Sequence, residues 1–339
     1  MKSPSVLTRN IQAARKSFQP LFGTLEITQK CNLRCKHCYN FDRSTPYASQ
    51  NELTLDEIYK ALDALADLGV LSLNVSGGEP LLHPDLFDIL DYAQSHHFHL
   101  RIKSNGTLIT KDLAKKLRTH GVKEIDISLY GANEDSYISF SQKKGFSKTI
   151  QSIRFCKEAG LPVNTSIILH RGNYTELTEM IRILEEIGVQ YFVSDEITDR
   201  YDGTEAKTDL ALQEEDYLVL LKGPHRHFFA HENEQKNVMC GCAKSVIGID
   251  AHGEVYPCIG APLPCGNIRH QELRKIWDES PTLKRIRALE FKDFDECSKC
   301  SLITKCSRSS GSAYINTKKY TGCDPTALTY ARARIKSES

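Results

Sequence analysis

The chain has 339 residues, which is long enough for one large domain and a smaller one. Its 44 basic and 43 acidic residues nearly cancel, so neither nucleic acid nor an anionic membrane is expected as a partner. No apolar signal core follows Met1, and no stretch approaches the roughly 20 apolar residues of a membrane span. We therefore expect a cytoplasmic protein, in which 12 cysteines indicate metal or redox chemistry rather than a disulfide framework.

The first part of the chain alternates predicted strands with predicted helices. The predicted strands cover residues 22–28, 70–75, 99–103, 123–129, 163–169 and 189–193. Helical periodicity lies between them, and Thr54 and Gly69 are the expected N-cap and stop of the first such helix. This alternation predicts an α/β fold with a parallel sheet, as a closed or a partial barrel, and a ligand site at the carboxyl ends of its strands.

Three closely spaced cysteines, Cys31, Cys35 and Cys38, follow the first predicted strand. A [4Fe–4S] cluster normally takes four thiolates, one for each iron. A loop that supplies three leaves one iron open to a substrate or cofactor, whereas a structural zinc knot is closed. The loop therefore favours a catalytic cluster over structural zinc.

The segment Gly77-Gly78-Glu79-Pro80 follows the second predicted strand. Glycines let a backbone approach a ligand closely, and proline stiffens the exit from the turn. Together with the cysteine loop, this segment resembles the radical S-adenosylmethionine (SAM) superfamily. The resemblance implies a partial (β/α)6 barrel in which the loop cysteines hold the cluster and SAM chelates the open iron. It also implies that the glycine-rich segment contacts the methionine amino group.

The same resemblance assigns further contacts to SAM. Glu79 is expected at the amino group and Ser128 at the carboxylate or ribose of SAM. Ser104 and Asn105 are expected near the adenosyl moiety. Tyr130 lies where many relatives have an acidic residue, so it is a candidate catalytic donor, with simple packing as the alternative. These residues lie at or just after the carboxyl ends of predicted strands, at the edge where a parallel sheet binds ligands.

Eight further cysteines lie after residue 239 and form two groups. The first group is Cys240, Cys242, Cys258 and Cys265, and the second is Cys297, Cys300, Cys306 and Cys323. Residues 246–256 have the pattern of a β-hairpin, which would bring Cys242 and Cys258 to one metal centre. From spacing alone, zinc would also accept either group.

Next to a radical SAM domain, the two groups resemble the SPASM extension, which carries two auxiliary iron–sulfur clusters. The hairpin between Cys242 and Cys258 matches its pattern, as does the Cys-x2-Cys-x5-Cys run that starts at Cys297. With Cys323, that run is expected to close the distal auxiliary cluster, so the resemblance implies three [4Fe–4S] clusters in the chain.

One position departs from the SPASM pattern. Ser310 lies where the family has a cysteine that helps to close the first auxiliary cluster. Cys240 resembles the upstream ligand of that cluster, and we expect Cys265 to replace the missing one. The alternative is an open iron that faces the substrate.

The expected architecture is thus a partial (β/α)6 radical SAM barrel followed by a small cysteine-rich SPASM domain with a β-hairpin. The expected divisions are an N-terminal extension at 1–20, the barrel at 21–200, a bridging segment at 201–238, the SPASM domain at 239–330 and a tail at 331–339.

The resemblance implies an enzyme that reductively cleaves SAM to a 5′-deoxyadenosyl radical, with an electron from an external low-potential donor, and abstracts a substrate hydrogen. Because many SPASM enzymes modify ribosomal peptides, we expect a peptide or protein substrate that is crosslinked, epimerised or oxidised at a side chain. Few residues precede Cys31, so leader recognition would fall to a separate protein or be absent.

Two alternatives stay open at the level of the sequence. One is the maturation of a small cofactor, such as a tetrapyrrole or quinone precursor. The other is a non-catalytic iron–sulfur electron carrier or scaffold, against which the SAM-contacting segment argues.

Overall fold

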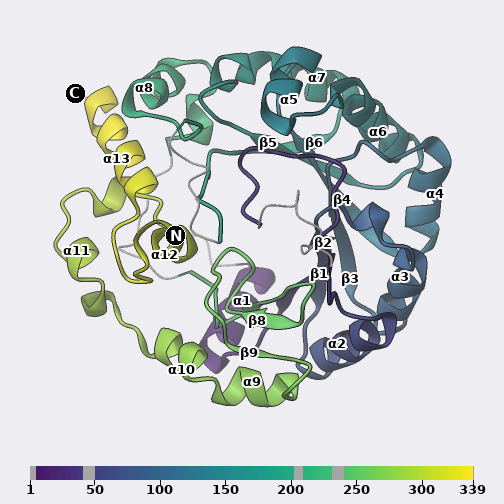
Figure 1. Ribbon diagram of the computed structural model, residues 1–339. Helices are drawn as coiled ribbons and strands as arrows, with labels where there is room; N and C mark the ends of the chain where they lie inside the picture. Colours follow the sequence, from purple (N-terminus) through teal and green to yellow (C-terminus); the bar gives the residue numbers. More distant parts are fainter. Residues whose placement is uncertain (1–4, 41–49, 202–208, 231–239, 339) are drawn as a thin grey trace.

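The protein is built around one curved sheet (Figure 1). The computed structural model describes residues 5–40, 50–201, 209–230 and 240–338. Within these ranges nine strands pair in the order β6-β5-β4-β3-β2-β1-β7-β8-β9. Six of them are parallel and follow one another in the chain: β1 (Phe22–Thr28), β2 (Ser72–Gly77), β3 (His99–Ser104), β4 (Val122–Leu129), β5 (Val163–Ile168) and β6 (Gln190–Ser194). Each predicted strand of the alternating region is therefore present.

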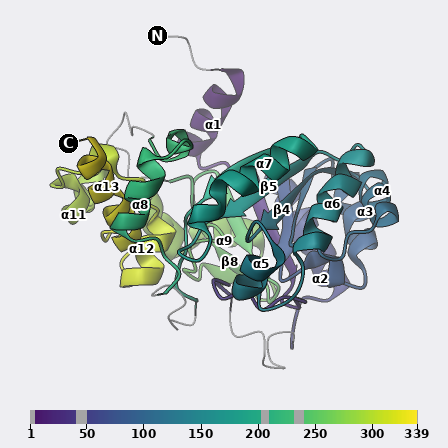
Figure 2. The same cartoon turned by 90° about the horizontal axis from the view of Figure 1, so that it is seen from above.

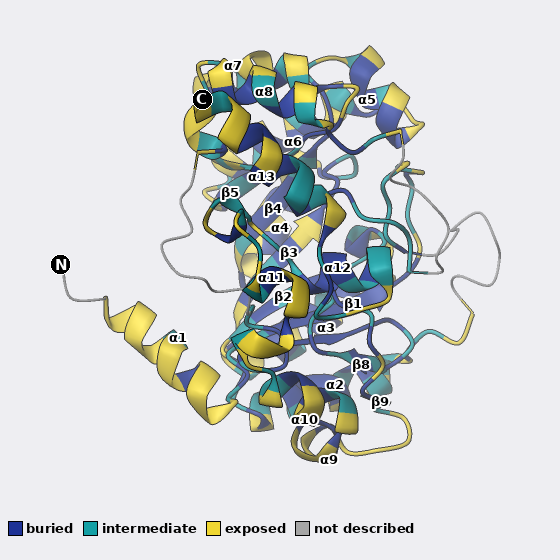
Figure 3. Cartoon of the chain, turned by 90° about the vertical axis from the view of Figure 1, so that its left-hand side faces the viewer, coloured by how far each residue is buried: buried dark blue, intermediate teal, exposed yellow. Residues whose placement is uncertain are grey.

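Helices cover the convex face of this sheet (Figure 1). They are α2 (Leu55–Asp67), α3 (Leu86–Ser95), α4 (Lys111–Thr119), α6 (Phe146–Glu158) and α7 (Leu177–Ile187). The expected cap of α2 is confirmed, since the Thr54 hydroxyl accepts a hydrogen bond from the Glu57 amide at 3.3 Å. Two further helices, α1 (Val6–Ser17) and α5 (Glu134–Ser141), were not indicated by the sequence pattern. Of the two, α1 projects from the body (Figure 2) and is mostly exposed (Figure 3).

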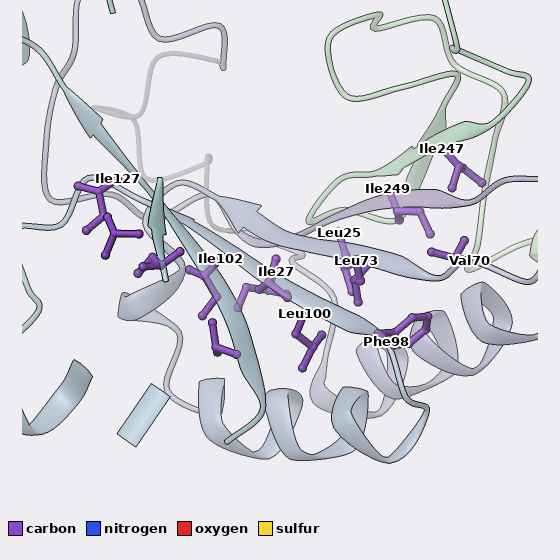
Figure 4. Packing of buried hydrophobic residues seen from close by; sticks show 14 of the residues in the cluster. Leu25, Ile27, Val70, Leu73, Phe98, Leu100, Ile102, Ile127, Ile247 and Ile249 are labelled. Atoms are coloured by element: carbon purple, nitrogen blue, oxygen red, sulfur yellow. The ribbon is translucent and has the colours of Figure 1, made fainter. Parts of the chain in front are cut away.

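Strand alternation divides the sheet into an apolar and a polar face. Leu25, Leu73 and Leu100 are fully buried and pack toward the helices (Figure 4). The residues between them are polar, and Arg101 on β3 pairs with Glu124 and Asp126 on β4 at 2.8 and 3.1 Å. Strands of a closed parallel barrel are apolar on both faces. The polar inner face therefore fits the open, ligand-binding interior of a partial barrel.

The predicted hairpin of the cysteine-rich region is confirmed, and it extends the same sheet. Its strands are β7 (Val246–Ile249) and β8 (Glu254–Tyr256), and Gly253 makes the turn with a φ of 85°. Strand β7 pairs in parallel with β1, from Phe22 opposite Val246 to Leu25 opposite Ile249, and β9 (Gly266–Asn267) pairs with β8. The hairpin thus shares the sheet of the barrel through β1.

The remaining helices complete the ring opposite β1–β6 (Figure 1). They are α8 (Glu214–Lys222), α9 (Leu273–Glu279), α10 (Pro281–Ala288), α11 (Asp295–Ser298), α12 (Ser310–Thr317) and α13 (Pro325–Glu338). Helix α13 continues through the expected boundary at 330/331 and packs on α8, where the rings of Tyr330 and Tyr217 lie 5.3 Å apart. The expected boundary at 238/239 lies outside the described residues, and no described helix is long and apolar enough to cross a bilayer.

Arg269 ties the hairpin region to the start of α2. Its guanidinium donates to both carboxylate oxygens of Glu57, at 2.7 and 3.0 Å, and to the carbonyls of Asn51 and Glu52, both at 2.9 Å. The hydrogen bond from Arg269 is the largest of the effects that lower the pKa of Glu57, to about 2. Two segments far apart in the chain are therefore joined by one bidentate, charge-assisted contact.

We expect Arg269→Met to destabilise the protein by about 2 kcal/mol, because it removes a bidentate ion pair and two bonds to backbone carbonyls. Anaerobic denaturant unfolding measures the effect. Arg182→Met is the matched control, since that arginine pairs with Glu179 on the exposed face of α7 and should contribute less than about 1 kcal/mol. Equal effects of the two substitutions would contradict the interpretation.

Candidate functional site

A cavity of about 520 Å³ opens at the carboxyl ends of β1 to β4. Nine of the predicted site residues line it: Cys31, Cys35, Cys38, Gly77, Gly78, Ser104, Asn105, Ser128 and Tyr130. Residues from four separate segments of the sequence are thus brought to one place by strand order. Glu79 and Pro80, which were also predicted at this site, lie buried behind the lining.

The cysteine loop is held in position from α5. The amides of Arg34 and Lys36 donate to the carbonyls of Ser141 and Phe140, both at 3.0 Å. The ring of His37, between the second and third cysteines, stacks on Phe140 with 4.6 Å between centroids. These contacts hold the backbone of the loop in place, and its three cysteines line the cavity.

Gly77 and Gly78 are required by the close approach of the backbone that leads into the cysteine loop. A Cβ atom on Gly77 would collide with the carbonyl of Thr28, and one on Gly78 with the carbonyl of Lys30. Gly77 also has a φ of 131°, which favours glycine. The amides of Gly78 and Glu79 donate to the same two carbonyls at 2.7 Å. The sequence predicts that these glycines let the backbone approach a ligand. In the structure they allow the backbone to approach residues 28–30, which lead to Cys31.

Glu79 organises the polar wall of the cavity from behind. Its side chain is fully buried, and its carboxylate accepts hydrogen bonds from the Ser104 hydroxyl and the Asn105 amide, both at 2.8 Å. It also accepts one from the Leu81 amide at 3.3 Å. Contact between Glu79 and the SAM amino group stays a prediction. These three hydrogen bonds fix the position of the Glu79 carboxylate.

Asn105 connects this wall to the cysteine loop. Its side-chain amide donates to Asn32 at 2.9 Å and lies 4.0 Å from the Cys31 sulfur. Its oxygen accepts from the amide and hydroxyl of Thr107 at 2.9 and 2.6 Å. Asn32 and Thr107 are site residues that the motifs did not indicate, because only the fold brings them beside the first cysteine.

Tyr130 lies at the base of the loop and is 7% exposed. Its ring packs against those of His37, Tyr137 and Phe140 with centroids 5.2 to 5.7 Å apart. Burial, together with the nearby Cys35, raises the pKa of the Tyr130 phenol well above its usual value. A phenol that stays protonated suits a donor rather than a base, but the catalytic role of Tyr130 stays a prediction.

The structure brings the second cysteine group together. Cys297, Cys300, Cys306 and Cys323 line one small cavity between α11 and the start of α13. Arg308 lines the same cavity, and its charge acts to lower the pKa of Cys297 against the larger opposing effect of burial. The geometry fits the predicted distal cluster site.

The first group is brought together only in part. The hairpin places the sulfurs of Cys242 and Cys258 2.7 Å apart, and a hydrogen bond from Cys242 lowers the pKa of Cys240 to about 5. Cys265 instead donates to the carbonyl of Leu263 at 3.3 Å, and burial raises its pKa to about 12. Ser310 lines one cavity with Cys240 and Cys242. The Cys258 thiol is among the groups that act on the pKa of Cys265. Ligation by Cys265 stays a prediction.

Two tyrosines connect the loop to the first auxiliary group. Tyr39, next to Cys38, lies with its ring centroid 5.0 Å from that of Tyr201. The Tyr201 hydroxyl donates to the carbonyl of Ile259, which follows Cys258 and also lines the main cavity. Below them the buried Glu26 accepts from the Tyr39 hydroxyl at 2.7 Å. The interior between the two cysteine sites is therefore a packed, hydrogen-bonded wall.

The arrangement of the cysteines fits clusters better than single ions. Among the described residues, no three His, Cys, Asp or Glu side chains converge on a point where one metal ion would sit. A four-iron cluster needs no such point, since it takes one thiolate on each of its irons. Three cysteines facing one roomy cavity, and four around another, meet that requirement.

Comparison with known proteins agrees with this geometry. The family model described as radical SAM superfamily matches residues 25–184, and the iron–sulfur cluster-binding SPASM domain matches residues 240–301. The chain therefore belongs to the radical SAM superfamily of enzymes and carries a C-terminal SPASM domain, so its cofactors are iron–sulfur clusters and SAM.

The similar proteins include both a heme synthase and peptide-related proteins. The chain is 28% identical to an AdoMet-dependent heme synthase of Methanosarcina barkeri, over 89% of this chain and 95% of that protein. It is 29% identical to the antilisterial bacteriocin subtilosin biosynthesis protein AlbA of Bacillus subtilis, over 82% of this chain and 63% of that one. Streptococcus suis SuiB, solved with its precursor peptide SuiA, has the same fold, with a TM-score of 0.71 and 18% identity over 95% of this chain and 80% of that one.

We expect replacement of Cys31, Cys35 and Cys38 by alanine to remove about one third of the iron, from about 12 to about 8 atoms per chain. Iron and sulfide analysis after anaerobic reconstitution measures the change. Cys156→Ala is the control, because that cysteine is fully buried on α6 and outside the three cysteine groups. Unchanged iron in the triple variant would contradict the assignment.

We expect Glu79→Gln to weaken SAM binding at least about tenfold while leaving the iron content intact, because an amide loses the charge that holds Ser104 and Asn105. Equilibrium dialysis with SAM measures the affinity. Ser95→Ala, at the exposed end of α3, is a neutral control. Loss of iron in Glu79→Gln would instead assign the carboxylate to support of the cysteine loop.

Proposed function

We propose that the protein uses SAM to generate a radical that abstracts hydrogen from a substrate bound in the main cavity. The observation that carries the proposal is the common cavity of the three loop cysteines with Gly77, Gly78 and the wall held by Glu79. When bound, the cluster and SAM supply the chemistry, which is reductive cleavage of SAM to a 5′-deoxyadenosyl radical.

The chain itself has three tasks in this reaction. The contacts from α5 orient the cysteine loop, and Glu79 with Asn105 orients the wall where SAM is expected. The packed tyrosines Tyr39 and Tyr201 close the interior toward the auxiliary sites and limit the entry of water. Auxiliary clusters in the cysteine-rich region would accept an electron from the substrate or bind it.

For the substrate, we propose a peptide or protein. Support comes from the similarity to AlbA and from the fold shared with SuiB, a protein solved with its precursor peptide. The expected modifications are a crosslink, an epimerisation or an oxidised side chain, with an external electron donor.

A small carboxylate-bearing cofactor precursor, such as a tetrapyrrole, is the second candidate. The similarity to a heme synthase runs over nearly the whole of both chains. In addition, the described lining of the main cavity holds three cationic side chains, Arg34, Lys103 and Arg200, and no acidic one. Such a lining favours anionic groups on a ligand.

Anaerobic protein with intact clusters, given SAM and dithionite, is expected to release 5′-deoxyadenosine, and the triple cysteine variant is expected to release none. Absence of 5′-deoxyadenosine from protein with intact clusters would contradict the enzymatic proposal and favour an electron carrier. Chromatography quantifies the 5′-deoxyadenosine that is released.

Mass spectrometry after turnover separates the two substrate classes. Candidate peptides, especially any encoded beside this gene, are compared with a carboxylate-bearing tetrapyrrole. A mass change in a peptide that depends on SAM supports the first class. A change in the tetrapyrrole alone, weakened about tenfold or more by Lys103→Met or Arg200→Met, supports the second.

A further inference from the structure

The first auxiliary site has a serine where a fourth ligand belongs. Cys240, Cys242 and Ser310 line one small cavity, and the sulfur of Cys258 lies 2.7 Å from that of Cys242. Ser310 is 1% exposed, and it begins α12. Its side chain is therefore buried beside Cys240 and Cys242, at the position where the family pattern has a cysteine.

Close backbone packing fixes the position of Ser310. The next residue, Gly311, lies so close to Gly260 that a Cβ atom would collide with the Gly260 carbonyl. Gly260 belongs to the turn that follows Cys258, in which the Ala261 amide donates to the Cys258 carbonyl at 3.0 Å. The start of α12 is thus held against the turn that carries the third cysteine.

Arg308 holds the hydroxyl group of Ser310. Its guanidinium donates to the Ser310 oxygen at 2.7 Å and to the carbonyl of Gly322 at 2.8 Å, with a further bond to the carbonyl of Tyr320. It also lies 4.9 Å from the ring centre of Phe294. A cationic donor stabilises negative charge on the oxygen that it contacts. The oxygen is therefore oriented and made a better ligand for a metal.

Cys265 lies in different surroundings. Its amide donates to the carbonyl of Val255 at 2.8 Å, and its sulfur to the carbonyl of Leu263 at 3.3 Å. It belongs to the same buried apolar cluster as Ile276 and Leu283. Its sulfur is thus hydrogen-bonded within the core, with Ser280 and Cys258 near enough to act on its pKa. Unlike Ser310, Cys265 does not line the cavity of Cys240 and Cys242.

We propose that the Ser310 oxygen, held by Arg308, ligates the fourth iron of the first auxiliary cluster beside Cys240, Cys242 and Cys258, and that Cys265 is a packing residue. As the iron–oxygen bond forms, the hydroxyl proton is released to solvent, and no electron is transferred. The inference rests on the proposed cluster at this site and concerns the identity of its last ligand.

The test compares four variants of the full chain after anaerobic reconstitution: Ser310→Ala, Ser310→Cys, Cys265→Ala and Cys258→Ala. Ser310→Ala should lose about one iron atom and give the EPR signal of an oxidised three-iron cluster. Ser310→Cys should keep about 12 iron atoms and shift the midpoint potential of one cluster. Cys265→Ala should match the unmodified protein in iron content, EPR and potential, whereas Cys258→Ala should lose up to about four iron atoms.

Loss of iron in Cys265→Ala, with Ser310→Ala unchanged, would overturn the proposal and assign the ligand to Cys265. Unchanged iron and spectra in both variants would also overturn it, since the last ligand would then be neither residue. If Ser310→Ala does not fold, an unchanged potential in Ser310→Cys overturns it instead. Release of 5′-deoxyadenosine, measured on the same samples, tests the proposed function separately because that reaction belongs to the loop cysteines.

Discussion

The site depends on a backbone contact between the end of β2 and the end of β1. Gly77 and Gly78 lie against the carbonyls of Thr28 and Lys30 so closely that no side chain fits at either glycine. The contact sets where β1 releases the chain into the cysteine loop. It also sets where Glu79 enters the interior, since the Glu79 amide is bonded to Lys30. One tight turn therefore positions both the expected cluster loop and the carboxylate behind the SAM wall.

A chain of buried hydrogen bonds connects that turn to the rest of the site. Glu79 holds Ser104 and Asn105, and Asn105 reaches the first cysteine through Asn32. A buried carboxylate is costly unless its oxygens are bonded, and here the chain supplies the donors. The inner face of the sheet is polar and lines the expected ligand cavity, while the opposite face forms the apolar core under the helices.

The two parts of the chain share one sheet, and this bears on how they work together. Because β7 pairs with β1, the hairpin that carries Cys242 and Cys258 is aligned in register with the strand that leads to Cys31. Tyr39 and Tyr201 fill the space between the two sites. Main-chain pairing across β1, together with the Arg269 contact to α2, sets the separation of the two centres more rigidly than a linker between domains would.

The sequence by itself determined the six parallel strands, the cap of α2, the hairpin and both groups of motifs, because these are local: they depend on periodicity, spacing and turn chemistry within short segments. Local pattern did not indicate α5 as the support of the cysteine loop, the pairing of β7 with β1, or Asn32 and Thr107 beside Cys31. The sequence predicts Cys265 as the replacement ligand from the cysteine count, which does not say where a side chain lies, and that ligation stays a prediction. Only the tertiary structure decided that Ser310 lies with Cys240 and Cys242, because the packing of Gly311 on Gly260 joins segments that are distant in the chain.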